Sequence, residues 1–320
     1  IPNFVLPLVL SKDSSAYGPI YYLLRAALLM AAIPAFLFVS QIVLENQKTD
    51  VILDEDVSPI QAHGRLFRVT KKNAKYQALY GILLYLLIFL PLDFFSYWLI
   101  PGFLDYQANA LAVSVTNSYL LQGYAVFLIS VIIIQVSVSL YEETLMRGFV
   151  TKRGAANFHK MSAVLISSFY FGMMHFAYIL NPISANYPIY LPLIFFIESF
   201  FIGLTLAIFI IKKNWLWPVI LAHGLNNIVS AHAVWSYLQG NDFSTISYLL
   251  YLPLGILAIG LLLLQYPNVK QGFQAGINEI KGYFRADEMK GETKQDAYVR
   301  IGLDLLMGFL IFFMALLFGV

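Results

Sequence analysis

The sequence predicts an all-α polytopic membrane protein with about eight transmembrane helices in a bundle, and two observations lead to this prediction. Of the 320 residues, 59% are hydrophobic and only 12% are charged, whereas soluble domains contain roughly 45–50% apolar and 25% charged residues. Uncharged tracts such as 119–140 hold about 20 residues, which at 1.5 Å per residue cross a hydrocarbon core of about 30 Å. This composition excludes a soluble enzyme of the same length.

Apolar stretches of membrane length predict the spans in order along the chain. We expect them at 19–44, 76–100, 119–141, 161–180, 188–211, 215–235, 245–266 and 301–320. An even number of spans places both termini on the same side of the membrane.

The basic residues alternate between connections and so predict the orientation. Four segments, 45–75, 142–160, 212–214 and 267–300, carry 18 of the 20 Lys and Arg residues, and the connections at 101–118, 181–187 and 236–244 carry none. By the positive-inside rule the four basic segments are cytoplasmic. The sequence therefore predicts a multi-pass protein of the cell membrane with both termini outside.

Two of the basic segments are long enough to have structure of their own. In 267–300, apolar residues recur every three or four positions, which predicts an amphipathic helix on the cytoplasmic surface; they are Val269, Phe273, Ile277, Ile280 and Phe284. The 45–75 segment shows no clean period and is expected to form an ordered or partly ordered cytoplasmic hairpin. The whole of 1–320 is one transmembrane domain in this interpretation, with a catalytic core at about 120–235.

Other bulk properties exclude several classes of function. A net charge of +2 implies no general attraction to nucleic acid. The absence of cysteine excludes disulfides, thiolate nucleophiles and Cys-ligated metals. No internal repeat is visible, which disfavours a transporter built from repeated halves.

Ionisable residues inside a membrane span cost free energy, so each one is a functional hypothesis. Arg25, Asp93, Glu198 and Asp304 each stand alone, and we interpret them as helix-packing contacts or snorkelling side chains. The other polar residues gather in three short segments, YEETLMRGF (141–149), FYFGMMHFAY (169–178) and LAHGLNNIV (221–229). This clustering predicts a shared site.

The first segment predicts an ion pair beside a free carboxylate. Glu143 and Arg147 are four residues apart, so they share a helix face and can form an ion pair. Glu142 points about 100° away and stays free. An unpaired carboxylate in a poorly solvated site is suited to take a proton from water.

The other two segments each contribute a histidine. His175 follows Phe171 by one turn, and Gly172 lets a neighbouring helix approach closely, so the histidine is expected to face the interior. His223 and Asn227 are four residues apart and project side by side, about 6 Å apart. Such a pair can donate two hydrogen bonds to a developing oxyanion.

The ordered set EETLMR (142–147), FGMMH (171–175) and HGLNN (223–227) resembles the EExxxR, FxxxH and HxxxN/B motifs of the type II CAAX prenyl endopeptidases. This family is also called the CAAX-processing and bacteriocin-processing (Abi) family of intramembrane proteases. The resemblance implies an eight-helix bundle with a conical cavity open to the cytoplasm. It also implies a peptidase that cuts a membrane-associated peptide or protein, with prenyl-protein processing and bacteriocin maturation or immunity as family roles.

The resemblance also assigns roles to the residues. Glu142 looks like the base that activates water, His175 like its partner, and His223 with Asn227 like the oxyanion-stabilising pair. Glu143, Arg147 and Phe171 are structural support. We expect no cofactor, although Glu142, His175 and His223 are also a zinc-site alternative; against zinc, Asn227 is a poor ligand and no HExxH motif is present.

Two other classes of function remain open at this level. One is a scaffold or regulator of the same fold that binds another membrane protein without catalysis. The other is a proton-coupled transporter that uses Glu142, His175 and His223 as a relay.

Overall fold

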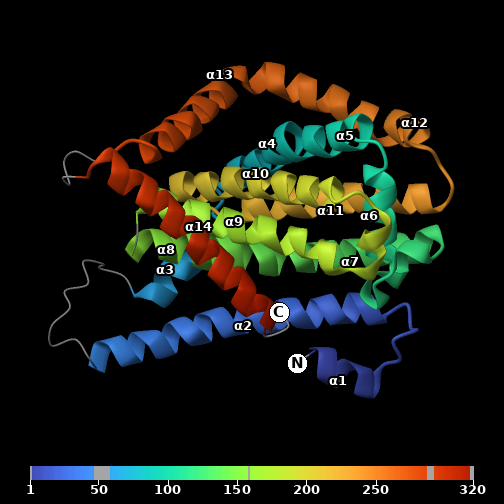
Figure 1. Ribbon diagram of the computed structural model, residues 1–320, viewed down its shortest axis with the longest axis horizontal. Coiled ribbons are helices and arrows are strands. Elements are labelled where there is room, and N and C mark those ends of the chain that lie inside the picture. The colour runs from blue at the N-terminus through green and yellow to red at the C-terminus, as the bar shows by residue number, and fades with distance from the viewer. Residues whose placement is uncertain (1, 47–57, 158, 287–291, 318–320) are drawn as a thin grey trace.

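The chain is a bundle of α-helices, and in the computed structural model residues 2–46, 58–157, 159–286 and 292–317 are described (Figure 1). Within these residues there is no β-strand, which agrees with the predicted fold class. The long helices are α2 (Tyr17–Asn46), α4 (Ala74–Leu84), α5 (Leu90–Leu99), α7 (Tyr124–Glu143), α9 (Lys160–Phe176), α10 (Tyr190–Lys213), α11 (Trp217–Leu238), α13 (Leu252–Tyr283) and α14 (Lys294–Leu317).

Short elements connect or extend them. These are α1 (Pro2–Val9), α3 (Pro59–Arg65), α6 (Phe103–Ala112), α8 (Lys152–Asn157) and α12 (Phe243–Ile246), with single-turn 3₁₀ segments η2 (Val115–Leu121), η4 (Ala177–Leu180) and η5 (Pro182–Asn186). Three π-helical turns interrupt the long helices: η1 (Tyr85–Phe89), η3 (Thr144–Thr151) and η6 (Ser247–Tyr251). Wide turns of this kind often mark functional sites, and η3 begins directly after the two glutamates of α7.

Seven helical segments of the described chain are long and apolar enough to cross a membrane. The eighth expected span, at 215–235, is α11, which runs from the end of the bundle where α10 finishes to the end where α12 begins (Figure 1). Its 22 residues suffice in length, but its histidines and asparagines lower its hydropathy. The sequence predicts eight spans, whereas seven segments of the described chain qualify by length and apolar composition. The difference is α11, whose polar residues lower its hydropathy.

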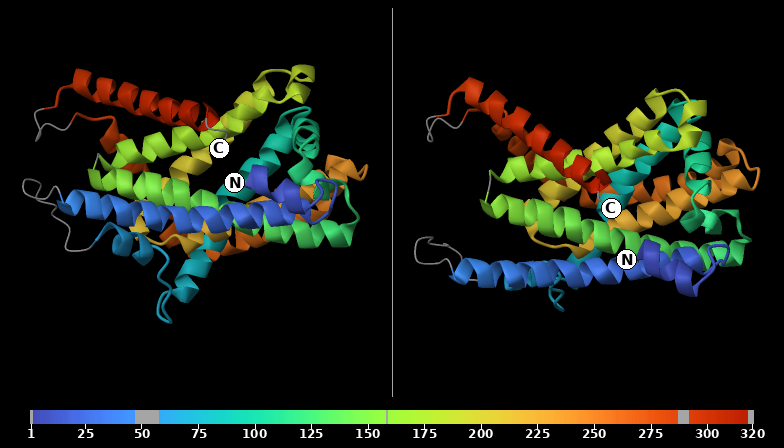
Figure 2. Two further views of the ribbon diagram at one scale, coloured as in Figure 1. Left: turned by 90° about the horizontal axis from the view of Figure 1, so that it is seen from below. Right: turned by 60° about the horizontal axis from the view of Figure 1, so that its bottom comes forward.

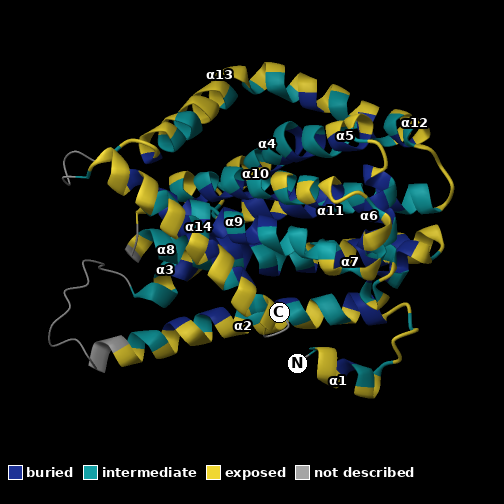
Figure 3. Ribbon diagram, viewed as in Figure 1, coloured by how far each residue is buried: buried dark blue, intermediate teal, exposed yellow. Residues whose placement is uncertain are grey.

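The central layer of the bundle consists of α7, α9, α10 and α11. Figure 3 shows more buried positions on these helices than on α2, α13 and α14, which carry many exposed positions. In both views of Figure 2, α2 lies along α7, and α14 packs on α9. The core is thus sequestered by helices whose outer faces are apolar and suited to lipid.

Small residues allow α9 and α10 to approach closely. A Cβ at Gly172 would lie 3.0 Å from the ring of Phe196, and a Cβ at Gly203 would lie 3.2 Å from the Cα of Ser168. Close backbone approach through small residues is the usual way in which membrane helices pack. This contact holds the helix of His175 against α10.

The helix expected on the cytoplasmic surface over 267–300 takes a different form. Residues up to Tyr283 continue α13 without a break, and the helix passes through Pro267 and bends (Figure 1). A proline inside a helix removes one backbone hydrogen bond and favours a bend. The predicted periodic residues thus belong to a long extension of the seventh span, and residues 287–291 lie outside the described residues.

The 45–75 segment is described only from residue 58 onward, because 47–57 lie outside the described residues. The described part docks on the start of α11, where the Trp217 indole donates to the carbonyl of Phe67 at 2.9 Å and the backbone N–H of Leu216 donates to Leu66 at 2.9 Å. His63 of α3 packs against Gly148 of η3. This part of the predicted hairpin is therefore ordered and in contact with α11 and η3.

Candidate active site

Two neighbouring glutamates at the end of α7 lie in opposite environments. The side chain of Glu143 is fully buried, whereas that of Glu142 is 24% exposed and lines a cavity. The phenol of Tyr141 donates a 3.3 Å hydrogen bond to Oε1 of Glu142. The two side chains therefore differ as the sequence predicts: Glu143 is enclosed, and Glu142 faces the cavity.

Glu143 forms the buried ion pair that the spacing predicts. Its Oε2 lies 3.2 Å from Nε of Arg147, and neither side chain is exposed. The guanidinium carbon of Arg147 lies 4.3 Å from the centre of the Phe171 ring, a cation–π distance. The pair thus links α7 and η3 to α9.

Glu143 also holds His223, a contact that spacing within one helix does not reveal. Its Oε1 lies 2.7 Å from Nδ1 of His223. Because a carboxylate only accepts, Nδ1 carries the hydrogen and Nε2 is left to face Glu142, whose Oε2 lies 3.8 Å away. A carboxylate behind the imidazole fixes its tautomer and its orientation, as in hydrolase triads.

His175 is fixed by the backbone of its own helix. Its Nδ1 donates to the carbonyl of Phe171 at 2.9 Å, which leaves Nε2 as the free nitrogen of the neutral ring. The Phe171 ring meets His175 edge to face at 4.7 Å and His223 at 5.9 Å between centroids. Phe171 therefore contacts Arg147 and both histidines.

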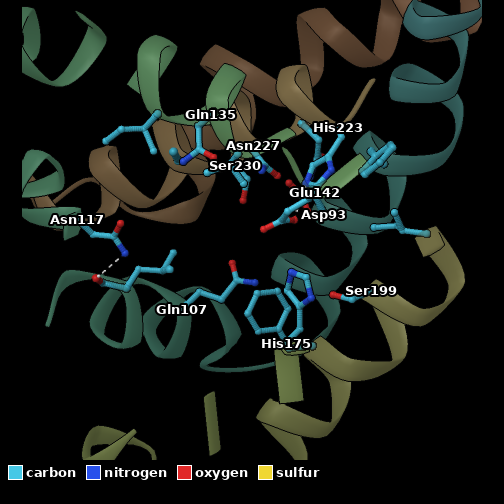
Figure 4. Close-up of a pocket in the computed structure, with 18 of the residues that line it drawn as sticks. Asp93, Gln107, Asn117, Gln135, Glu142, His175, Ser199, His223, Asn227 and Ser230 are labelled. Carbon is cyan, nitrogen blue, oxygen red and sulfur yellow. Dashed lines mark hydrogen bonds and ion pairs between the residues drawn. The ribbon is translucent and has the colours of Figure 1, made fainter. Parts of the chain in front are cut away.

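One cavity of about 210 Å³ brings the four predicted site residues together from three helices. Figure 4 shows Glu142 and His223 close together, Asn227 beside them and His175 across the cavity. The sequence separates these residues by as many as 85 positions. Further polar residues line the same cavity, namely Asp93, Gln107, Asn117, Gln135, Glu198, Ser199, Asn226 and Ser230.

Two of these residues, Asp93 and Glu198, do not fit the interpretation that each is a lone charge in a helix-packing contact. Asp93 of α5 and Glu198 of α10 both line the cavity, and Ser96 donates to Glu198. By contrast, Asp304 accepts from the phenol of Tyr283, and Arg25 lies 4.9 Å from the Tyr141 ring, as expected of packing contacts. A single charge in a span gives no signal that separates the two cases.

The cavity extends from Glu142 toward one end of the bundle. Its remote lining residues include Gln107 and Asn117 of the connections at 101–123, which carry no Lys or Arg. The side that the positive-inside rule assigns to the cytoplasm is the other one. The expectations of a cytoplasm-facing cavity and of cytoplasmic basic loops therefore point to opposite ends.

The zinc alternative fits poorly with this arrangement. In the described part of the chain, no three His, Asp or Glu side chains come together as a metal ion requires, although Glu143 behind His223 is the kind of partner that metal-bound histidines have. No step below is routed through a metal.

The described chain is an all-helical bundle in which a carboxylate, two histidines and an asparagine surround an internal cavity. Residues 124–229, about a third of the chain, match the family model Type II CAAX prenyl endopeptidase Rce1-like. This segment is similar to that family, which confirms the resemblance of the three motifs. No curated protein and no solved structure matches the chain.

Proposed function

We propose that the protein is an intramembrane endopeptidase that hydrolyses a peptide bond of a membrane-associated peptide or protein with a water molecule activated by Glu142. The observation that carries this proposal is the contrast between the two glutamates: one is buried and fixes His223, and the other faces the cavity within 3.8 Å of the same imidazole. The family match over 124–229 supports the peptidase class.

In the proposed reaction, Glu142 takes a proton from water and the water oxygen bonds to the scissile carbonyl carbon. The free nitrogen of His175 accepts a hydrogen bond from the second O–H of the water, which stays intact, and so orients the nucleophile. The carbonyl electron pair moves to oxygen, and the oxyanion accepts hydrogen bonds from the His223 imidazolium and the Asn227 amide. The C–N bond then breaks as Glu142 passes its proton to the leaving nitrogen.

The buried pair of Glu143 and Arg147 has a positioning role in this proposal. Glu143 orients His223 and places a carboxylate behind its imidazole, and Arg147 pairs with Glu143 where both side chains are fully buried. Neither residue touches the reacting atoms. No cofactor takes part.

The test is cleavage of a quenched fluorescent peptide library by the purified protein in nanodiscs. We expect cleavage by the wild type, a loss of about 10²–10⁴-fold in Glu142→Gln, and no effect of a zinc chelator. The matched control is Glu279→Gln on α13, a carboxylate outside the cavity that pairs with Lys212. Loss of activity with the chelator would instead support the zinc alternative.

A different outcome would favour the scaffold alternative. If no condition gives cleavage and Glu142→Gln still restores the phenotype of a deletion strain, the protein acts by binding another membrane protein. The transporter alternative predicts proton-dependent flux in the same nanodisc or vesicle preparations.

A further inference from the structure

The lining of the cavity is rich in carboxyl groups. Three of them line it, those of Asp93, Glu142 and Glu198, and none of the described residues that line it is Lys or Arg. A buried carboxyl group needs hydrogen-bond donors, and where it is ionised it needs a cation as well. Asp93 and Glu198 differ from Glu142 in how the protein meets this need.

Glu142 has cations in its surroundings. Arg25 lies against Tyr141, whose phenol bonds to Glu142, and Arg147 lies one turn and a quarter further along the chain, where its charge acts on Glu142. Arg25 and Arg147 of the protein thus supply positive charge near Glu142.

Asp93 and Glu198 have no such neighbour. Asp93 accepts from Ser230, whose hydroxyl also lies 2.9 Å from the phenol of Tyr97, and Glu198 accepts from Ser96. The charged group that acts on Glu198 is Asp93, another carboxylate. In the described part of the chain, no Lys or Arg acts on either carboxyl group.

Two buried acceptor atoms at this end of the cavity lack a hydrogen-bond donor. They are Oδ2 of Asp93 and Oδ1 of Asn226, and neither has a partner among the described residues. The side chain of Asn226 is only 8% exposed and lines the cavity one turn before Ser230. Because buried polar atoms are nearly always satisfied by protein or water, these acceptors are available to a ligand that carries hydrogen-bond donors and displaces water from this part of the cavity.

The position of this acidic end relative to the catalytic centre follows from α11. Ser230, the partner of Asp93, lies seven residues after His223, which is about 10 Å along a helix. An extended peptide advances about 3.3 Å per residue. A group bound at Asp93 is therefore about three residues from a peptide bond held at His223.

We propose that Asp93 and Glu198 form a specificity subsite that binds a cationic group of the substrate, about three residues from the scissile bond. The ammonium or guanidinium group of a Lys or Arg residue, or a free amino terminus, supplies both the positive charge and the donors that this end of the cavity lacks. The inference rests on the proposed peptidase function, but the binding test below does not require cleavage.

The experiment measures binding of fluorescent peptides to the Glu142→Gln protein in nanodiscs. Each peptide carries lysine or the neutral isostere norleucine at one position, scanned along the whole peptide, and a parallel set has an acetylated amino terminus. We expect lysine to bind about tenfold to a hundredfold more tightly than norleucine at one position. If no lysine position is preferred and acetylation of the amino terminus weakens binding, the cation that the subsite binds is the amino terminus.

The variants Asp93→Asn and Glu198→Gln, each added separately, are expected to bring the ratio of lysine to norleucine affinity close to one. The control Glu279→Gln should leave the ratio unchanged, and thermal unfolding of each variant shows that the bundle is intact. A ratio near one in the unmodified cavity, or a ratio that survives both variants, would overturn the subsite. Lysine-dependent binding without any cleavage by the wild type would retain the subsite and remove the peptidase.

Discussion

The helices of the family-matched segment and the helices around them use polar residues in different ways. In α7 with its extension and in α9, 44% of the apolar 18-residue stretch is buried, against 17% in α2, α13 and α14. The ion pair of Glu143 and Arg147 lies within the first group and is fully enclosed. The pair that joins Lys212, at the end of α10, to Glu279 of the surrounding helix α13 is 43% and 35% exposed.

The comparison shows that the depth of a charged residue, more than its type, decides how it is paired and how much it contributes to stability. A buried charge must be paired and hydrogen-bonded, so Glu143 is tied to two partners and in turn fixes a third helix. A marginal charge is solvated and contributes little. The predictions below test this contrast, from the largest expected effect to the smallest.

The largest effect is expected for Glu143→Gln. The glutamine keeps the shape of the side chain but removes the negative charge behind His223, so the imidazolium loses its stabilisation. We expect peptidase activity to fall about 10³–10⁴-fold, the scale seen when the orienting carboxylate of a hydrolase triad is neutralised. Initial cleavage rates in nanodiscs check this, with Glu279→Gln as the control; near-normal activity would remove Glu143 from a positioning role.

The next effect concerns stability. Arg147→Met leaves Glu143 buried without its cation, and we expect a loss of about 3–5 kcal/mol in the free energy of unfolding. Lys212→Met at the margin should change it by about 1 kcal/mol or less. Denaturation in detergent followed by tryptophan fluorescence measures both, and equal losses would contradict the contrast between the two regions.

Two glycines, one at a helix contact and one on an open helix face, differ in the same way. Gly172→Ala places a Cβ about 3.0 Å from the Phe196 ring and 3.1 Å from its carbonyl oxygen, so we expect a destabilisation of about 1–3 kcal/mol. Gly260→Ala on α13 meets no atom within 4 Å and should stabilise the helix slightly, by up to about 1 kcal/mol. Thermal unfolding of the two variants side by side distinguishes packing from propensity.

The smallest effect is a pH dependence outside the spans. Burial of the His63 side chain against η3 lowers its pKa, so the folded state favours the neutral imidazole. The resulting stability is fully present above the unfolded pKa of about 6.5 and is lost as pH falls below it. Melting temperatures at pH 8 and pH 5.5 should differ more in the wild type than in His63→Gln, and an equal difference would show that α3 does not respond to pH.

Hydropathy and motif spacing predicted much of this molecule. The spans followed from runs of apolar residues, and Glu142, His175, His223 and Asn227 followed from helical spacing together with the family resemblance. These signals are local, because a helix fixes which of its own residues share a face.

The remaining features depend on how helices rotate against one another, which spacing within one helix cannot supply. The contact between Glu143 and His223 joins residues 80 positions apart. Asp93 and Glu198 face the cavity only because of the rotation of α5 and α10 in the bundle. The continuity of α13 through Pro267 is not predicted either, because hydropathy and period separate an apolar span at 245–266 from an amphipathic segment at 267–300.

The polarity of α11 also has a consequence for how the protein is made. A helix with His223, Asn226 and Asn227 on it partitions poorly into lipid by itself. It packs on α4 and α7, and both precede it in the chain, so its polar face can be received by helices already in the membrane. The residues proposed for catalysis thus make insertion of α11 dependent on earlier spans, and the order of synthesis supplies those spans first.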